Sequence, residues 1–256
     1  MELFDDALFN TLSIEHWLIV ENVRTLFLAH FKSDVTKHPS FDCSDKTTAL
    51  INWSYIVHEN ALTFINFFRQ ITEFEDFDCD DRLILIKYNL FPVYPVVKCF
   101  YHDKNHDCWK NIDTEEILRR RRFFADCFGS DNTRQLYMNV IESLINISER
   151  DPAILALILI ILMFYQGLSM NDAEPLLKDT LQVNRAQSHY VNVLWNYSVH
   201  KWGETETQKR FSQLILIIFR MQIVSKLFRD FFCNQVRISN AADKIAPLMQ
   251  TVLHIA

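Results

Sequence analysis

The stretch FFRQITEFEDFDCDDRLILIK, which runs from Phe67 to Lys87, decides the fold of this chain. Two aromatic residues lead into Arg69, a loop with two phenylalanines and several acids follows, and an aliphatic segment begins after the acids. Acidic side chains at the start of a helix accept hydrogen bonds from its free backbone N–H groups and interact favourably with its dipole. We therefore expect one helix to end before this loop and another to begin at a cap formed by Asp78 or Asp80.

The residues before the loop have the spacing of a long helix, at about 45–71. Positions that recur every three or four residues fall on one face of that helix: Trp53, Val57, Asn60, Phe64, Phe67 and Ile71. Asn60 is the polar exception, and its amide needs a partner from the backbone, from water or from a ligand. The sequence favours a hydrogen-bond partner for the Asn60 amide within the core.

Helical patterns continue through most of the chain. Ser13 is typical of a helix start, and so is the pair Asp151-Pro152, which places proline in the first turn. Pro92 and Pro95 are expected to bend or divide the helix that begins near residue 80. Further helices are expected at about 114–127, 131–148, 152–166, 171–201, 205–234 and 242–254.

These segments predict an all-α protein in which about ten to twelve helices form a layered antiparallel sandwich. The apolar run from Ala153 to Tyr165 is too short to cross a bilayer, so we expect a helix buried on all sides. The polar segment at 103–112 is expected to form a short β-hairpin or a plain loop. No repeat or low-complexity linker divides the chain, which indicates a single domain over residues 1–256.

The composition argues against several classes of protein. The chain has 256 residues, a formal net charge of -6 and three glycines. The absence of excess positive charge argues against direct nucleic-acid binding, and the scarcity of glycine argues against dinucleotide and phosphate loops. Six scattered cysteines without a C-x-x-C pair show no zinc module and suit a reducing compartment. We expect no metal and no cofactor, and no catalytic set emerges from the spacing.

Three polar clusters could be interpreted as binding sites. One could hold magnesium and a diphosphate in a helical isoprenoid-processing enzyme, and it comprises Glu75, Asp76, Asp78, Asp80 and Asp81. That chemistry needs a second acidic motif facing the first, which the sequence does not offer, and helix capping accounts for the acids. The other two clusters match no strong metal template and no pattern beyond a solvated helix face: His102, His106 and Cys108, and Arg119–Arg122.

The opening stretch resembles the signature of nuclear receptor ligand-binding domains. That signature has an aromatic, a small and a basic residue, then Phe, an aliphatic residue, Asp-Gln and two aliphatics at fixed intervals. The matching residues here are Phe67, Phe68, Arg69, Phe74, Phe77, Asp81, Arg82, Leu85 and Ile86. The chain departs from the pattern at Phe68, Phe77 and Arg82, where the family has a small residue, a leucine and a glutamine. The order of helices is similar too, so the resemblance covers nearly the whole chain.

The resemblance implies a surface groove for coregulator helices of the Leu-x-x-Leu-Leu type. Its floor would be lined by Ile65, Leu83 and Ile86. Its cations would be Arg69 and Lys87, together at one rim, where they would meet the free carbonyls at one end of the partner helix. A mobile C-terminal activation helix within 242–256 would complete the groove with Leu248, Met249, Thr251 and Val252.

The C-terminal helix departs from the family pattern at its acidic position. The family has two apolar residues, any residue, a glutamate and two more apolar residues there. In this chain Leu248 and Met249 are followed by Gln250 and Thr251, so a hydroxyl stands where the family has a carboxylate. The lost charge costs about 1–2 kcal/mol of binding free energy. We expect weak or unusual coactivator recruitment, or a bias toward corepressors.

The resemblance also implies a lipophilic ligand of the sterol, retinoid or fatty-acid class, held in a largely apolar pocket. The residues expected to line it are Trp53, Ile56, Val57, Asn60, Ala61, Phe64, Tyr94, Val97, Tyr101, Phe228 and Phe232. Because the chain contains 21 phenylalanines, its own side chains could equally fill the pocket. The domain would then be a ligand-independent orphan receptor.

The function implied by the resemblance is that of a non-enzymatic, nuclear transcription regulator. It would form a homodimer, or a heterodimer with a retinoid X-type receptor, through the helix at 205–234. It would reach DNA only through a separate domain absent from this chain, and no membrane partner is expected. Two rivals remain, the isoprenoid enzyme and a purely structural helical module with a filled core.

Overall fold

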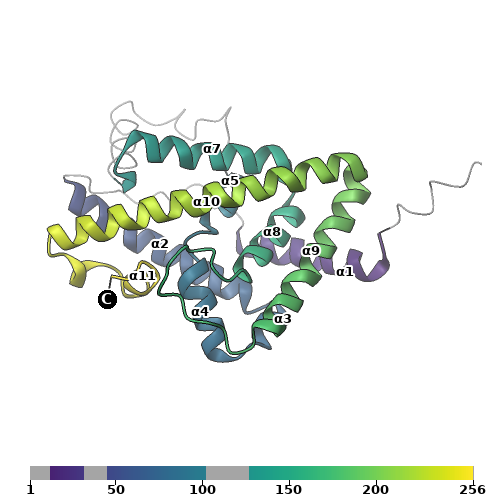
Figure 1. Cartoon of the computed structure of the whole chain (residues 1–256), viewed down its shortest axis with the longest axis horizontal. Helices are drawn as coiled ribbons and strands as arrows, with labels where there is room; N and C mark the ends of the chain where they lie inside the picture. The colour runs from purple at the N-terminus through teal and green to yellow at the C-terminus, as the bar shows by residue number, and fades with distance from the viewer. Residues whose placement is uncertain (1–11, 32–44, 102–126, 256) are drawn as a thin grey trace, which may run out of the picture.

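The computed structural model describes residues 12–31, 45–101 and 127–255, and within these ranges it contains helices and no strands (Figure 1). The α-helices are α1 (Ile14–His30), α2 (Lys46–Phe68), α3 (Thr72–Glu75), α4 (Cys79–Asn89), α5 (Tyr94–Tyr101), α7 (Asp131–Ser148), α8 (Pro152–Met163), α9 (Thr180–Trp202), α10 (Glu204–Ile238) and α11 (Pro247–Val252). The all-α class expected from the sequence is confirmed. The segment expected to form a hairpin or loop at 103–112 and most of the helix expected at 114–127 lie outside the described residues.

Several helices begin at a side chain that the sequence offers as a cap. Ser13 accepts a hydrogen bond from a backbone N–H of α1, and Asp45 does the same for α2. Asp78 caps α4 by accepting the Asp80 N–H at 2.9 Å, which settles the choice between these two acids. Asp151 caps α8 in the same way, with proline at the first helical position.

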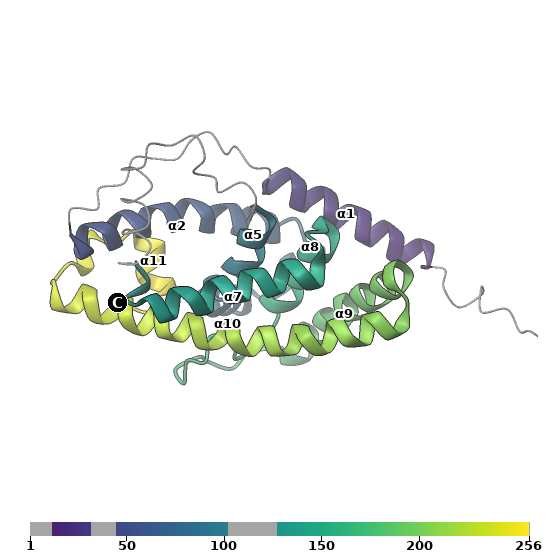
Figure 2. The ribbon, with the colours of Figure 1, turned by 90° about the horizontal axis from the view of Figure 1, so that it is seen from above.

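The helices pack in three layers (Figure 2). α1 and α2 lie along one side, α7 and α10 run beside each other along the opposite side, and α5 and α8 lie between them. α8 contacts α1, α4, α5 and α9, and ten of its twelve residues are buried. The apolar run in the sequence therefore forms the central helix of the core, as its composition predicts.

The phenylalanines of the opening stretch anchor the connection between α2 and α4 to the central helix. Phe74 and Phe77 are both buried and both contact Phe164, at the end of α8, with ring centroids 6.3 and 5.1 Å apart. Phe68 contacts Phe74 at 5.7 Å and extends the cluster back into α2. Ring contacts at these distances are favourable in themselves and bury a large apolar area. The aromatic loop is therefore part of the core.

Two polar side chains of α4 hold the chain between α8 and α9. The carboxylate of Asp81 is buried and accepts hydrogen bonds from the N–H groups of Lys178 and Asp179, at 2.7 and 3.0 Å. The amide of Asn89 donates to the carbonyls of Met163 and Tyr165, at 2.7 and 2.8 Å. Because backbone groups buried without partners are costly, these bonds fix the path of the segment.

Two boundaries show how prolines and distant contacts act on the helices. The helix expected at 171–201 begins only at Thr180, because Pro175 has no N–H to donate and Asp81 holds the N–H groups just before the helix. The helix expected to begin near residue 80 is divided at Pro92, and the axes of α4 and α5 differ by 63°. The division at Pro92 confirms the prediction for that helix, and the late start of α9 corrects the boundary expected at residue 171.

Candidate functional site

The C-terminal helix α11 lies against α2 and α4. Its start is fixed by the Ala246 N–H, which donates to the hydroxyl of Ser54 in α2 at 3.2 Å. Met249 and Val252 are buried and face the core, whereas Leu248 is half-buried and Thr251 is exposed. Of the four residues expected at the surface, the structure therefore leaves two accessible. The helix expected at 242–254 is also shorter, because a 3₁₀ turn at Ala242–Lys244 precedes it.

The exposed faces of α2 and α4 are linked at one end by α3, through Glu75, and at the other end by α11, which contacts both helices. At the α3 end, Glu75 bridges Arg69 at the end of α2 to Arg82 in α4, with contacts of 3.6 and 2.7 Å. Between the two ends, Ile65 and Ile86 are half-buried and Leu83 is 57% exposed. These are the three floor residues expected from the sequence, and all of them reach solvent.

Leu62 adds an apolar side chain that the sequence analysis missed. It lies three residues before Ile65 and seven before Arg69, so it shares their face of α2, and it is 41% exposed. That spacing is the signal that would have found it. We call the surface formed by Leu62, Ile65, Leu83 and Ile86 the α2–α4 surface.

The two expected cations lie at opposite ends of the α2–α4 surface. Arg69 is largely exposed and pairs with Glu75 beside α3. Lys87 lies near the last turn of α4, with its Nζ 5.5 Å from the centroid of the Tyr88 ring. That ring is in turn 4.7 Å from the ring of His254, just after α11. The sequence led us to expect both cations at one rim, but α4 runs from the Arg69 end toward α11 and carries Lys87 with it.

Two cations, Lys87 and Arg229, act on His254 at the α11 end of this surface. Burial, Arg229 and Lys87 together lower the pKa of His254 to about 4, so its ring is neutral at neutral pH. The Nε2 atom of His254 is buried and has no hydrogen-bond partner. Thr251, at the position where the family has an acid, is exposed and donates only a 3.5 Å hydrogen bond to the Pro247 carbonyl. This end therefore offers cations and a hydroxyl in place of a carboxylate.

Aromatic rings occupy the region expected to hold a ligand. Trp53 packs on Phe228 and Phe232, with centroids 4.7 and 5.4 Å apart. Phe91 lies 5.0 Å and Phe128 lies 5.6 Å from Phe228. Rings at these distances are in contact and leave little space between them. We call Trp53, Phe91, Phe128, Phe228 and Phe232 the aromatic cluster, and it fills this part of the expected pocket with protein side chains.

The remaining residues expected at the pocket also find partners within the protein. The Asn60 amide donates to the Ile56 carbonyl at 2.7 Å, so its own helix supplies the partner that the polar exception needs. The others are buried or half-buried in the core: Val57, Ala61, Phe64, Tyr94 and Val97. Tyr101 ends α5, and its side chain lies outside the described residues.

Lys178 pairs with two acids of the acidic cluster at the start of α4. Its Nζ lies 2.6 Å from Asp80 and 3.0 Å from Asp78, and these hydrogen bonds raise its pKa. The backbone N–H of Asp80, followed by Lys178, lowers the pKa of Asp78. Oxygen and sulfur atoms of Asp78, Cys79 and Asp80 could together reach one metal ion, but all three are exposed and a lysine already supplies the positive charge. The other two polar clusters named in the sequence analysis lie outside the described residues: His102, His106 and Cys108, and Arg119–Arg122.

The long helix α10 leaves an apolar stripe exposed, within the expected dimer face at 205–234. Its members are 44–57% exposed and follow one another along the helix: Ile215, Leu216, Phe219, Ile223 and Leu227. A shallow groove of about 350 Å³ lies between α9 and α10, lined by Ser188, Val191, Asn192, Trp195 and Phe211. Among single helices in the described ranges, α10 alone is also long and apolar enough to cross a membrane, and a third of that span is buried.

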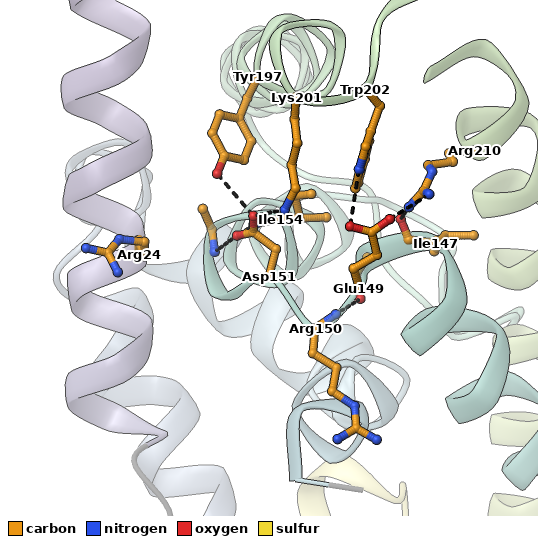
Figure 3. A network of polar contacts seen from close by, with 12 residues as sticks. Arg24, Ile147, Glu149, Arg150, Asp151, Ile154, Tyr197, Lys201, Trp202 and Arg210 are labelled. Carbon is orange, nitrogen blue, oxygen red and sulfur yellow. Dashed lines mark hydrogen bonds and ion pairs between the residues drawn. The ribbon is translucent and has the colours of Figure 1, made fainter. Parts of the chain in front are cut away.

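A polar network joins the α7–α8 turn to the α9–α10 turn (Figure 3). Asp151 accepts hydrogen bonds from the Tyr197 hydroxyl, at 3.1 Å, and from Lys201. Glu149 accepts one from Arg210 at 2.8 Å, and the Arg210 guanidinium lies 3.9 Å from the ring centroid of Trp202. Burial and the nearby Asp151 raise the pKa of Tyr197, which therefore stays a hydrogen-bond donor. We call Glu149, Asp151, Tyr197, Lys201, Trp202 and Arg210 the turn network.

Comparisons of the chain with protein-family models and with curated proteins give no match.

Proposed function

We propose that this chain is a regulatory domain of the nuclear receptor ligand-binding type, and that its α2–α4 surface binds coregulator helices of the Leu-x-x-Leu-Leu type. The observation that carries the proposal is the position of α11 at one end of an exposed apolar surface whose other end holds an exposed cation, Arg69, in a long 3.6 Å contact with Glu75. The signature residues support it, since Phe74, Phe77 and Asp81 tie the α2–α4 connection to α8 and α9.

Arg69 is available to hold one end of a partner helix. Glu75 makes its short contact, 2.7 Å, with Arg82, and its contact with Arg69 is longer, 3.6 Å. The Arg69 side chain is 67% exposed. The last carbonyls of a helix lack intrahelical partners and carry partial negative charge, so an exposed guanidinium at this position binds them favourably. The apolar anchors of the partner would then cover Leu62, Ile65 and Leu83.

The version of this function that the geometry supports best is the ligand-independent one. The aromatic cluster fills part of the expected pocket, and Asn60 is bound by its own helix. The alternative is a lipophilic ligand of the sterol, retinoid or fatty-acid class. Native mass spectrometry of protein made in cells separates the two, because a bound lipid adds its mass and raises the melting temperature by mass action. We expect no co-purified lipid.

Regulation of transcription in the nucleus follows from this proposal, with DNA reached only through a separate domain. We further propose that the apolar stripe of α10 pairs with a second copy or with a retinoid X-type receptor, rather than with a membrane. Its other face is used by α7 and α9, which leaves one stripe of the helix for a partner. Light scattering should show a dimer of the chain alone if the partner is a second copy, and Phe219→Asp should shift it to monomer.

Fluorescence polarisation with a labelled Leu-x-x-Leu-Leu peptide tests the proposed function. Arg69→Ala should weaken binding by about tenfold, because a charge-assisted contact to the helix end is lost. Leu83→Asp should abolish it. Arg185→Ala removes an exposed cation from α9 and serves as the matched control, with unchanged affinity. If the peptide still binds tightly to both the Arg69→Ala and the Leu83→Asp variants, the proposal is wrong.

A further inference from the structure

Lys87 borders the α2–α4 surface at its α11 end. It lies one residue after Ile86 and four after Leu83, so it shares their exposed side of α4. Its side chain is half-buried, with the ammonium group over the Tyr88 ring. A lysine in this setting packs its stem against apolar neighbours and keeps its charge at the surface. Lys87 thus presents a fixed cation to anything that covers Leu83 and Ile86.

Two further charged side chains, Arg229 and Glu174, act on the residues beside this cation. Arg229 of α10 adds a second positive charge beside His254 and donates to the Ser169 carbonyl at 3.3 Å. Glu174 is the acid that acts on Tyr88. Glu174 keeps its negative charge, which opposes that of Arg229 at Tyr88, and its two oxygens accept hydrogen bonds from the Gly167 N–H and the Ser169 hydroxyl, at 3.0 and 3.1 Å.

The charged residues farther along α10 have opposite signs. Asp230 and Arg237 act on Cys233 with opposite signs. α11 itself contains no acid, and Asp243 precedes it in the 3₁₀ turn, before the start that Ser54 holds. Among the residues that the structure describes, Lys87 makes no ion pair, and its charge lies next to the apolar side chains of Leu83 and Ile86.

A partner helix held by Arg69 at its C-terminal end has its N-terminus at this positive end. The free N–H groups of a helix N-terminus carry partial positive charge, so Lys87 repels an unmodified helix start. Acidic residues just before the first apolar anchor remove that repulsion and pair with Lys87. We infer that the partner of the α2–α4 surface is a Leu-x-x-Leu-Leu-type helix preceded by Asp or Glu. This inference rests on the proposed function and specifies the charge of the partner.

Three stapled peptides that share one Leu-x-x-Leu-Leu core test the inference. They differ only in the three residues before the first leucine, which are Glu, Gln or Lys, and the staple keeps their helicity equal. Polarisation titrations at low salt should show the Glu peptide binding about tenfold tighter than the Lys peptide. Lys87→Glu should reverse that order, and the preference of the unmodified protein should shrink at high salt. Lys98→Glu makes the same charge change at an exposed site on α5 and should leave the order unchanged.

The outcomes separate the inference from the function on which it rests. If the peptides bind with affinities that do not depend on their flanks, or if the Lys peptide binds best to the unmodified protein, the inference is wrong and the proposed function stands. If Lys87→Glu leaves the ratio of the affinities for the Glu and Lys peptides unchanged, Lys87 does not contact the residues before the first leucine, and the inference is equally wrong. If no peptide binds, the proposed function and the inference fail together.

Discussion

The turn network and the α11 end of the α2–α4 surface lie near opposite ends of α10, and they use their charges differently (Figure 1). In the turn network, Asp151 accepts hydrogen bonds from α8 and α9, and Glu149 accepts them from α9 and α10. At the α11 end, Lys87 and Arg229 act on a neutral His254 whose Nε2 has no partner. The charges of the turn network are paired within the chain, whereas Lys87 makes no ion pair in the part of the chain that the structure describes, and it borders the surface that we assign to a partner.

Breaking the turn network should have the largest effect on stability. Asp151→Ala removes the cap of α8 and leaves Tyr197 and Lys201 without their acceptor, and the Asp151 side chain is only 11% exposed. We expect a loss of about 3 kcal/mol in the free energy of unfolding, measured by urea denaturation. The matched control is Asp131→Ala, at an exposed acid of α7, which should change stability by less than about 0.5 kcal/mol. A loss as small for Asp151→Ala as for the control would contradict the assigned role.

Acid should destabilise the α11 end first. The pKa of His254 falls from 6.5 to about 4 in the folded protein, so the unfolded chain binds the proton more tightly. The stability that His254 contributes is therefore fully present above pH 6.5 and is lost as the pH falls through this window toward 4. Because the ring is half-buried, we expect about 1–2 kcal/mol.

The variant that isolates this effect is His254→Phe. It keeps a ring against Tyr88 and removes the titrating group. Urea denaturation at several pH values should show a smaller loss of stability for the variant between pH 6.5 and pH 4. Identical pH profiles for the two proteins would show that His254 does not carry the effect.

A smaller change should follow from supplying the missing carboxylate. Thr251→Glu places an acid at the exposed position near the N-terminus of the docked partner and opposes the charge of Lys87. Peptides with a neutral flank should then bind about fivefold tighter. Stability should change little, because Thr251 is exposed and makes only one long hydrogen bond. Unchanged or weaker binding to Thr251→Glu would place the partner's N-terminus elsewhere.

The local features of this fold could be predicted from the sequence. Ser13, Asp78 and Asp151 cap helices because their side chains bond backbone groups two or three residues away. The all-apolar run becomes the central helix α8, and Pro92 divides the helix in which it stands. Each of these outcomes depends on neighbours in the chain, which a sequence pattern contains.

The features that the sequence analysis missed depend on contacts between distant residues. The late start of α9 is set by Asp81, which is separated from Lys178 by 97 positions. The separation of Arg69 from Lys87 depends on the direction in which α4 runs past α2, and spacing along one helix does not contain that direction. The pairing of Trp53 with Phe228 likewise needs α2 and α10 to meet. Residue types could suggest a groove and a pocket. Only the packing shows which side chains fill the pocket and which border the groove.

Hydrogen–deuterium exchange of the protein with and without a saturating Leu-x-x-Leu-Leu peptide tests the central claim most directly. If the helix docks between α2 and α4, added protection should appear in segments 62–69, 79–89 and 247–253. The turn network, at 147–151 and 197–210, should exchange at the same rate in both states. Protection confined to α9 and α10, or none at a peptide concentration that saturates binding, would contradict the account.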